Sequence, residues 1–275
     1  MIFFGIFFDI FWLLCYYLPM LALERQKYIE KELKVSGSIL ISEMSAKLKC
    51  SEETIRRDLS ELEKNQKLVR VHGGAYLPLD SDKGVPAKIK EILLPLEKQK
   101  IADIAVKKFI NENDTIFIDS STTCLTLARK IIDLNLSVTI ITNSLLIFEY
   151  FCDNSCENVK LIGLGGNYRQ RACSFVGYDT SETIKKYSAD KCFLSPSAVS
   201  YDHGILDNSS NECEIRKSFI RQSKQHILLS DHTKLGDTAN YVIASLDDLD
   251  FVVTDEIPEK KWLDIFETKK IELYY

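Results

Sequence analysis

Residues 51–65, SEETIRRDLSELEKN, predict a short helix that buries one face and exposes the other. Ile55, Leu59 and Leu62 follow one another at helical spacing, so at about 3.6 residues per turn they form a single apolar stripe. Ser51 stands just before the helix, where its hydroxyl can accept a hydrogen bond from an unpaired N–H group of the first turn. The sequence therefore indicates both where this helix begins and which side of it packs against a core.

The opposite face of this helix carries polar and basic side chains. Arg57, Ser60 and Lys64 point away from the apolar stripe, and Thr54 and Arg56 flank them. Taken alone, this face fits two alternatives: a solvated surface whose arginines pair with glutamates of the same helix, or a surface that binds an acidic partner. The segments on either side of the helix favour the second alternative.

A shorter helix is predicted directly upstream, over residues 42–49. Ile41, Met44 and Leu48 place apolar side chains at helical spacing, and Cys50 alone separates this segment from the helix that follows. The pattern is a helix, a tight turn and a second helix, which is the arrangement of a helix-turn-helix motif.

A β-hairpin is predicted downstream, in residues 67–77, KLVRVHGGAYL. Leu68, Arg70 and His72 alternate with valines, and the Gly73-Gly74 pair suits the positive φ angles of a tight hairpin turn. A hairpin that follows a recognition helix is the wing of a winged helix.

Two separate segments of this region resemble the amino-terminal winged helix of the DeoR family of bacterial transcriptional regulators. They are Ser51 with the run TIRRDL at residues 54–59, and the run RVHGGA at residues 70–75. The resemblance implies sequence-specific binding of double-stranded operator DNA. The residues that it places at the DNA are Ser51, Thr54, Arg56, Arg57, Arg70, His72 and Gly73.

The charge of the 275-residue chain is distributed unevenly, although its net charge of −5 argues against a nucleic-acid binder. Residues 20–75 carry 11 Lys and Arg against 9 Asp and Glu, whereas residues 76–275 carry 24 against 30. A weakly basic module thus precedes an acidic body. We expect DNA affinity to depend on where the arginines point and on the presentation of two copies.

Residues 1–19, MIFFGIFFDIFWLLCYYLP, are almost wholly apolar. A run of this length could span a membrane, but it has no basic segment before it and carries Asp9 near its middle. The sequence from Met20 onward looks like a normal DeoR-family amino terminus. We therefore interpret residues 1–19 as the product of too early a start codon, with a membrane tether as the alternative.

The predicted domains follow from where the periodic patterns break. Residues 20–77 form the winged helix-turn-helix, which begins with a helix over residues 21–33. Residues 78–96 are expected to be a linker, because they open with a polar, turn-rich stretch. Residues 97–275, which begin with a helix at 97–110, form the expected effector-binding and oligomerisation domain.

Beyond residue 113 the pattern indicates an α/β fold with a mostly parallel sheet. Short β-branched runs alternate with helical segments, as expected for strands joined by helices. In such sheets ligands bind outside the carboxyl ends of the strands. The candidate strands are residues 115–118, 138–142, 159–162, 191–194, 225–229 and 251–253.

Four of the strand ends carry groups that suit a phosphate. Residues 119–123, DSSTT, precede a predicted helix at 124–132 and offer hydroxyls and backbone N–H groups at its amino terminus. Residues 142–144, TNS, and the glycine-rich residues 163–166 follow two other strands, and Lys234 supplies an ammonium group. Each segment alone fits an ordinary cap or turn, but their convergence favours one shared site.

These same segments resemble the carboxy-terminal effector domain of the DeoR family, which is related to ribose-phosphate isomerases. The family usually has a glycine at the position of Ser121, and it tends to place glycines and an acidic residue in residues 195–200, where this chain has SPSAVS. By resemblance Glu212 and Lys217 face the site, although they could equally form a surface pair on a helix. The expected effector-binding residues are Asp119, Ser120, Ser121, Thr122, Thr123, Thr142, Asn143, Ser144, Gly165, Gly166, Glu212, Lys217 and Lys234.

The predicted function is that of a cytoplasmic transcriptional regulator, a repressor of a sugar uptake or catabolism operon that is switched by a phosphorylated sugar and acts as a homo-oligomer. The alternative is a sugar-phosphate isomerase with an accessory winged helix. Isomerisation needs a carboxylate base beside the phosphate, and residues 195–200 supply none, so we expect no enzyme activity.

No cofactor or metal is expected. The eight cysteines form no C-x-x-C pair and have no histidine at zinc-ligand spacing, which predicts reduced and mostly buried thiols.

Overall fold

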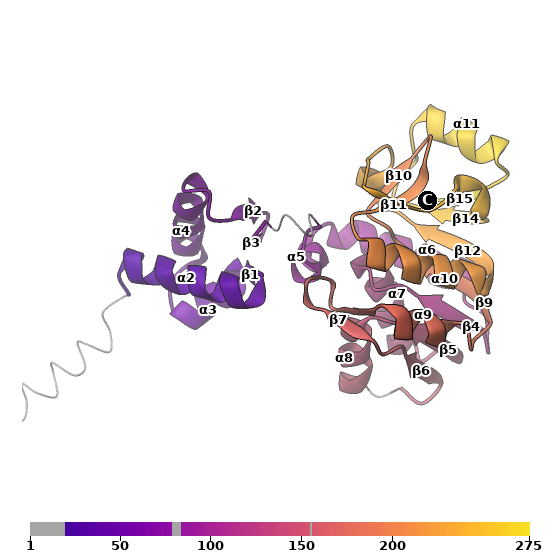
Figure 1. Cartoon of the computed structure of the whole chain (residues 1–275), viewed down its shortest axis with the longest axis horizontal. Coiled ribbons are helices and arrows are strands. Elements are labelled where there is room, and N and C mark those ends of the chain that lie inside the picture. The colour runs from indigo at the N-terminus through magenta and orange to yellow at the C-terminus, as the bar shows by residue number, and fades with distance from the viewer. Residues whose placement is uncertain (1–19, 79–83, 155) are drawn as a thin grey trace, which may run out of the picture. The chain divides into compact units, whose positions relative to one another are not determined.

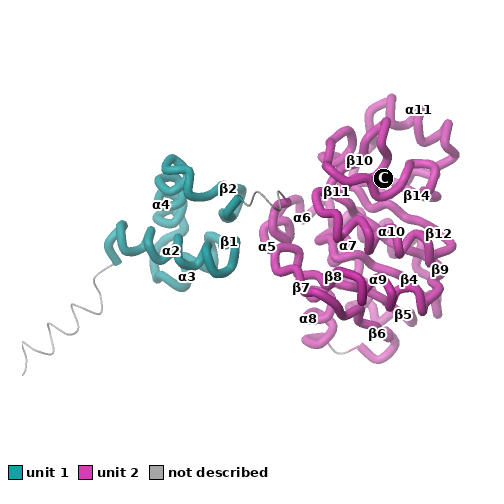
Figure 2. The backbone as a smooth tube through the Cα atoms, in the orientation of Figure 1, with its two compact units in different colours: residues 1–79 teal, residues 80–275 magenta. Residues whose placement is uncertain are grey.

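The computed structural model describes residues 20–78, 84–154 and 156–275. Residues 1–19, which we interpreted as a start-site extension, lie outside the described part. The chain divides after Leu79 into two compact units, coloured separately in Figure 2. No helix in the described residues is long and apolar enough to cross a membrane.

The amino-terminal unit is a three-helix bundle with a small antiparallel sheet of strand order β1-β3-β2 (Figure 1). Ile55, Leu59 and Leu62 are all buried, which confirms the predicted apolar stripe. They share a core with Ile29 of the first helix and Met44 of the second. The elements are α2 (Ala22–Ser36), β1 (Ser38–Leu40), α3 (Ile41–Leu48), α4 (Glu52–Lys64), β2 (Val69–Val71) and β3 (Gly74–Tyr76).

A buried ion pair joins the first helix of this unit to the third. Arg25 Nε of α2 donates to Asp58 Oδ2 of α4 at 2.5 Å, and its Nη2 donates to Oδ1 at 3.1 Å. The hydrogen bond to Asp58 raises the pKa of Arg25, although burial acts in the opposite direction. The two-point contact fixes the rotation of α4 about its own axis as well as its position.

The wing turns one residue earlier than predicted. Val71 pairs with Gly74 across the hairpin, so the two-residue loop is His72-Gly73, and Gly74 already belongs to β3. Only Gly73 needs a positive φ, of 83°. The wing is also tied to the helix-turn-helix, because the N–H of Ile41 donates to the carbonyl of Gly73 at 2.9 Å.

The carboxy-terminal unit is built on a seven-stranded parallel sheet of order β15-β14-β12-β9-β4-β5-β6. All six predicted strands are present. The seventh, β15, was missed because it is short and half polar. The strands are β4 (Thr115–Ile118), β5 (Val138–Thr142), β6 (Val159–Gly163), β9 (Ala189–Leu194), β12 (Ser223–Leu229), β14 (Phe251–Val253) and β15 (Glu272–Tyr274).

Helices pack on both faces of this sheet, as the alternation along β4 shows. Ile116 and Ile118 belong to one core cluster together with side chains of α6, α7 and α8. Phe117 belongs to the other cluster and stacks on Phe219 of α10, with ring centroids 4.6 Å apart. The helices are α6 (Pro95–Phe109), α7 (Thr122–Asp133), α8 (Leu145–Asp153), α9 (Tyr178–Ile184), α10 (Ser210–Arg221) and α11 (Lys260–Thr268).

Two small antiparallel sheets, absent from the prediction, extend the unit beyond the parallel sheet. β7 (Asn167–Arg169) pairs with β8 (Ser174–Val176), and β11 (Gly204–Asp207) lies between β10 (Ala198–Ser200) and β13 (Tyr241–Ala244). Their strands have three or four residues each, too few to show a period in the sequence.

The segment expected to be a linker, residues 78–96, contains a helix. α5 (Ala87–Ile92) packs on the carboxy-terminal unit through Ala87 and Ile89, which are buried. Arg129 of α7 forms a 2.7 Å ion pair with Glu91 of this helix. A helix of six residues has too few apolar positions for its period to be visible in the sequence, which is why the polar stretch around it dominated the prediction.

Candidate functional site

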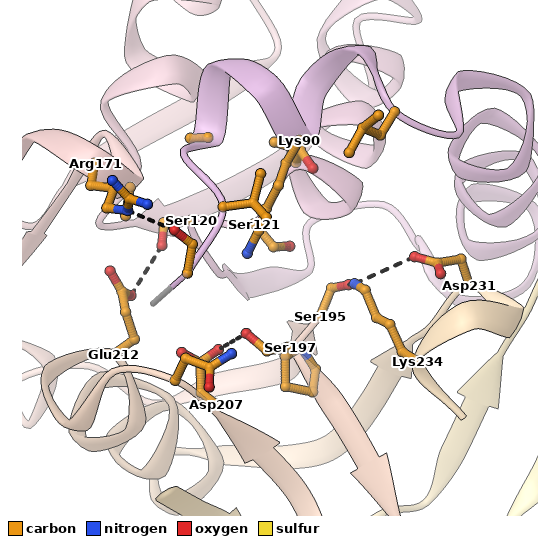
Figure 3. Close-up of a pocket in the computed structure, with 18 of the residues that line it drawn as sticks. Lys90, Ser120, Ser121, Arg171, Ser195, Ser197, Asp207, Glu212, Asp231 and Lys234 are labelled. Atoms are coloured by element: carbon orange, nitrogen blue, oxygen red, sulfur yellow. Dashed lines mark hydrogen bonds and ion pairs between the residues drawn. The ribbon is translucent and has the colours of Figure 1, made fainter. Parts of the chain in front are cut away.

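A cavity of about 320 Å³ opens at the carboxyl ends of β4, β9 and β12 (Figure 3). Its polar walls come from three strand-end loops, from α5 and α6, and from the antiparallel extensions. The polar and charged residues that line it are Lys90, Lys98, Ser120, Ser121, Thr122, Arg169, Arg171, Ser195, Ser197, Asp207, Asn208, Glu212, Arg216, Asp231, Thr233, Lys234 and Asp237.

The amino terminus of α7 faces this cavity. Ser121 caps the helix, because its hydroxyl accepts from the N–H of Cys124 at 3.2 Å and its own N–H donates to Asp119 at 2.8 Å. Ser120, Ser121 and Thr122 all line the cavity. The first-turn N–H groups and the helix dipole of this 12-residue helix favour an anion at this position.

Arg216 of α10 is buried between two carboxylates. Its Nε donates to Asp119 at 2.8 Å and its Nη1 donates to Asp207 at 2.7 Å. Burial alone would raise the pKa of Asp119, but the charge of Arg216 and hydrogen bonds from Ser121 and Ser195 lower it to about 2. The same contacts raise the pKa of Arg216, so all three groups stay charged inside the fold.

Glu212, one turn earlier on α10, is also fully engaged. Its carboxylate accepts from Ser120 Oγ at 3.1 Å, from Ser174 Oγ at 2.5 Å and from Arg169 Nη1 at 3.3 Å. It therefore holds the α7 entry loop and the β7-β8 hairpin on either side of α10.

Three lysines of the cavity, Lys90, Lys98 and Lys234, are less closely paired with carboxylates than Arg216 is. Lys234 Nζ donates to Ser195 Oγ at 2.8 Å and lies 3.6 Å from Asp231, whose other oxygen accepts from Thr233. Lys98 donates to the backbone carbonyls of Lys90 and Leu93. Burial, and next the charge of Lys234, lower the pKa of Lys98 to about 8. Burial also lowers the pKa of Lys90.

Basic side chains outnumber acidic ones in this cavity. Six Lys and Arg residues line it against four Asp and Glu residues. Arg169 and Arg216 pair with carboxylates, so the surplus positive charge falls on other basic residues of the cavity, including Lys90 and Lys98. The electrostatics of the cavity suit a ligand that carries negative charge.

The structure brings together five of the predicted effector-binding residues, namely Ser120, Ser121, Thr122, Glu212 and Lys234. Asp119 stands directly behind them, on Arg216. Thr123 is buried and does not line the cavity.

The other predicted effector-binding residues lie away from the cavity. Thr142, Asn143 and Ser144 are fully buried, where they bond to one another's backbone, to Phe175 and to the start of α8. The Gly165 carbonyl accepts from Thr180, and a Cβ at Gly166 would meet the Thr180 hydroxyl at 2.0 Å. Lys217 pairs with Glu214 one turn away on α10 and not with Glu212, which lines the cavity.

Sequence reasoning missed several cavity residues. Lys90 and Lys98 flank the boundary of the presumed linker, and Arg169, Arg171 and Asp207 lie on or beside the short antiparallel strands. No local pattern marks them, because only the three-dimensional path of the chain brings them to the strand ends. For the same reason, three carboxylates that line the cavity outside residues 195–200 were not among the expected effector-binding residues: Asp207, Asp231 and Asp237.

One cluster offers three potential metal ligands, although no metal site was expected. His232, Asp255 and Glu256 bring ligand atoms within 4.8 Å of one another. Both oxygens of Asp255 already accept from His232, one from its N–H at 2.8 Å and one from Nδ1 at 2.7 Å. We therefore assign this cluster a structural role.

A second candidate surface is the outer face of α4 in the amino-terminal unit. The side chain of Arg57 is 81% exposed, and its nearest acidic group, Glu53, lies 3.6 Å away. Arg56 is more engaged, since it pairs with Glu52 at 2.6 Å. Ser51 caps the helix through a 3.2 Å bond from the N–H of Thr54. The start and the orientation of α4 agree with the prediction.

The wing presents the remaining predicted DNA-binding residues. Arg70 and His72 are exposed on β2 and at the turn, next to Gly73. Arg70 is held by Glu63 of α4, which accepts its N–H at 2.9 Å and lies 3.7 Å from its guanidinium. Exposed basic groups therefore occur on both the helix and the hairpin of this unit.

Two family models match the chain. The DeoR-like helix-turn-helix domain matches residues 25–79, and the DeoR C terminal sensor domain matches residues 95–256. The chain belongs to the DeoR family of transcriptional regulators. The family assignment accounts for both units and for the cavity in the second.

Curated relatives in Bacillus subtilis (strain 168) are similar over most of their length. The uncharacterized HTH-type transcriptional regulator YulB is 34% identical, over 92% of this chain and 96% of the relative. The regulator IolR is 32% identical, over 86% and 92%, and the repressor GlcR is 30% identical, over 91% and 95%. These relatives are named as regulators, and this DeoR-family member is a transcriptional regulator rather than an enzyme.

Solved structures were also compared. Ribose 5-phosphate isomerase A from Methanocaldococcus jannaschii aligns with a TM-score of 0.36 and 17% identity, over 50% of this chain and 53% of the isomerase.

Replacing Arg216 tests how far the fold of this site depends on the buried triad of Asp119, Arg216 and Asp207. Arg216→Met leaves Asp119 and Asp207 without their shared cation, and breaking a buried pair in this way costs about 3–5 kcal/mol. We expect that loss in the free energy of unfolding, measured by guanidinium denaturation. Arg221→Met, on an exposed position of the same helix, is the matched control and should change the value by less than about 0.5 kcal/mol.

The pH dependence of the wild-type protein gives a second readout of the same triad. The folded pKa of Asp119 is lowered from 3.8 to about 2, so its stabilisation is present above pH 4 and is lost as the pH falls toward 2. Equal unfolding midpoints for Arg216→Met and the control would contradict the role of the triad.

Proposed function

We propose that this regulator represses a sugar uptake or catabolism operon and that a phosphorylated sugar, bound in the cavity of the sensor domain, switches its affinity for operator DNA. The observation that carries the proposal is the amino terminus of α7, with Ser120, Ser121 and Thr122, facing a cavity with surplus lysine charge. A phosphate dianion needs oriented N–H donors, hydroxyls and cations, and this arrangement supplies all three.

The rest of the cavity suits the sugar portion of such a ligand. Ser197 and Asn208 offer acceptors and donors for hydroxyl groups. A volume of about 320 Å³ lies at the lower end of the range for small-molecule sites. The names of relatives support repression, among them the transcriptional repressor GlcR and a putative aga operon transcriptional repressor in Escherichia coli O157:H7.

The isomerase alternative finds no support in the state of the carboxylates. Asp207 is bound to Arg216, Glu212 accepts three hydrogen bonds, and Asp231 accepts from Thr233 beside Lys234. A general base needs a free oxygen within reach of the proton that it removes. These three carboxylates hold the walls of the cavity instead, and the fourth, Asp237, is exposed and accepts the N–H of Thr238 at 2.8 Å.

Calorimetry with matched sugars tests the ligand class. We expect glucose 6-phosphate, fructose 6-phosphate, fructose 1-phosphate or ribose 5-phosphate to bind, and the corresponding unphosphorylated sugars to bind at least about 100-fold more weakly, because two or more charge-assisted hydrogen bonds are lost. Lys234→Ala and Thr122→Ala should weaken the phosphorylated sugar selectively. Equal binding of both sugar classes, or unaltered binding by the two variants, would remove the phosphate from this site.

The affinity for the sugar phosphate should also depend on pH. A bound dianion favours the charged form of Lys98, whose pKa is about 8, so affinity should fall as the pH rises through that value. Binding near pH 8 should then take up protons, which calorimetry detects in buffers of different ionisation enthalpy. Lys98→Met should bind more weakly and show a flatter profile between pH 7 and 9.

The outer face of α4 is proposed to contact base edges in the major groove, with Thr54, Arg56 and Arg57, while Arg70 and His72 of the wing lie at the backbone or minor groove. We expect Arg57→Ala to weaken binding to an operator duplex selected from random sequences by about 1–3 kcal/mol and to relax specificity at one position. Electrophoretic mobility shifts at matched salt measure both effects. Lys31→Ala, on an exposed position of α2, is the control. Undiminished binding by Arg57→Ala would misplace the recognition face.

Self-association is proposed because a single winged helix offers a small, weakly basic surface. Two half-sites bound by two copies multiply affinity through effective concentration, and this sets the spacing of the operator half-sites. We expect sedimentation at micromolar concentration to give a multiple of the 31.5 kDa chain mass. A strict monomer that still binds its operator tightly would refute the proposal.

A further inference from the structure

One wall of the cavity is made by the segment that connects the sensor domain to the DNA-binding unit. We define the strap as residues 84–98, which contain α5 and the start of α6. Its cavity-lining residues are Gly84, Val85, Ala87, Lys90, Leu93, Leu94 and Lys98. Only residues 79–83 separate the strap from Pro78, the last described residue of the winged helix, so the covalent connection between the units passes directly into the wall of the ligand site.

The strap is fastened by a small number of polar contacts. At its start the carbonyl of Gly84 accepts from Arg171 Nε at 2.6 Å. In its middle Glu91 pairs with Arg129 of α7 at 2.7 Å. Within the strap, Lys98 of α6 donates to the carbonyls of Lys90 and Leu93 and so ties the end of α5 to α6. A six-residue helix is unstable by itself, so α5 depends on these fastenings and on the burial of Ala87 and Ile89.

Lys90 projects from α5 into the cavity (Figure 3). Within the described part of the chain its ammonium group has no ion-pair or hydrogen-bond partner. Burial is the largest effect that disfavours its protonated form; the charge of Asp207 favours that form, and the charges of Lys234, Arg216 and Arg169 disfavour it. It is therefore unfavourable to place the protonated side chain of Lys90 in the cavity while the cavity holds no anion. A bound anion would make this placement favourable.

We propose that the strap is the element through which the effector controls operator binding: the anion of the effector binds Lys90 and thereby holds α5 in its seat. The inference rests on the proposed function, because it takes the occupant of the cavity to be a phosphorylated sugar. A ligand shifts an equilibrium only by its differential affinity for two states, and Lys90 supplies that difference since it belongs to the part that moves.

Two lysines of the same cavity allow a matched test. Lys90 belongs to the strap, whereas Lys234 lies on the turn after β12 (His232–Lys234), far from the strap in sequence. Lys90→Met and Lys234→Met each remove one positive charge from the cavity. The ratio of operator dissociation constants with and without saturating ligand is then measured within each variant, so that changes in basal affinity cancel.

The probe is the sugar phosphate of the calorimetric panel with the lowest dissociation constant for the wild-type protein, and saturation is verified by calorimetry for each variant. In the wild type we expect the operator ratio to lie between about 5-fold and 150-fold. Lys234→Met should bind the probe more weakly yet reach the wild-type ratio at saturation. Lys90→Met should bind the probe and leave a ratio within about 2-fold of one.

Two further variants separate charge from structure. Lys88→Met, on the exposed side of α5, should keep the wild-type ratio, and Lys90→Arg should restore most of it. Hydrogen exchange should show slower exchange in residues 87–93 when the probe binds the wild type, and no such slowing in Lys90→Met.

A wild-type ratio in saturated Lys90→Met, or equal loss of the ratio in Lys90→Met and Lys234→Met, would overturn the role of the strap while leaving the ligand site intact. If no member of the panel binds the wild-type protein, the proposed function fails instead, and the calorimetry shows this before any operator is added.

Discussion

The buried guanidinium of Arg216 is the constraint on which the sensor domain depends. It joins α10 to the end of β4 through Asp119 and to β11 through Asp207. Asp119 in turn accepts the backbone N–H groups of Ser121 and Ser195. One cation therefore sets the relative positions of two strand-end loops and an antiparallel extension, and the cavity is the space that remains between them.

This arrangement divides the charges of the cavity into two classes. Arg216 and Glu212 hold protein groups to one another, and their hydrogen-bonding capacity is used within the fold. The amino terminus of α7 and the lysines at positions 90, 98 and 234 keep capacity for a partner. The first class preorganises the amino terminus of α7 and Lys234, because these donors need no rearrangement when an anion enters.

The predictable part of the protein is the part governed by local periodicity. The buried stripe of α4, its Ser51 cap and six of seven parallel strands follow from spacing alone. The position of residues 120–122 at the cavity follows because strand ends converge in any parallel sheet. Arg216, Asp207 and Lys90 could not be found this way, since their roles depend on contacts between elements distant in sequence and on strands too short to show a period.

The Arg25–Asp58 pair has a consequence for how such a regulator can change its target. Asp58 is buried on the inner side of α4 together with the apolar stripe. Arg25 of α2 forms two hydrogen bonds with its carboxylate. The orientation of the helix is thus set entirely by residues that a DNA duplex would not touch. The exposed positions around Arg57 are free to vary without loss of the fold, so new operator preferences can arise by single substitutions in an unchanged scaffold.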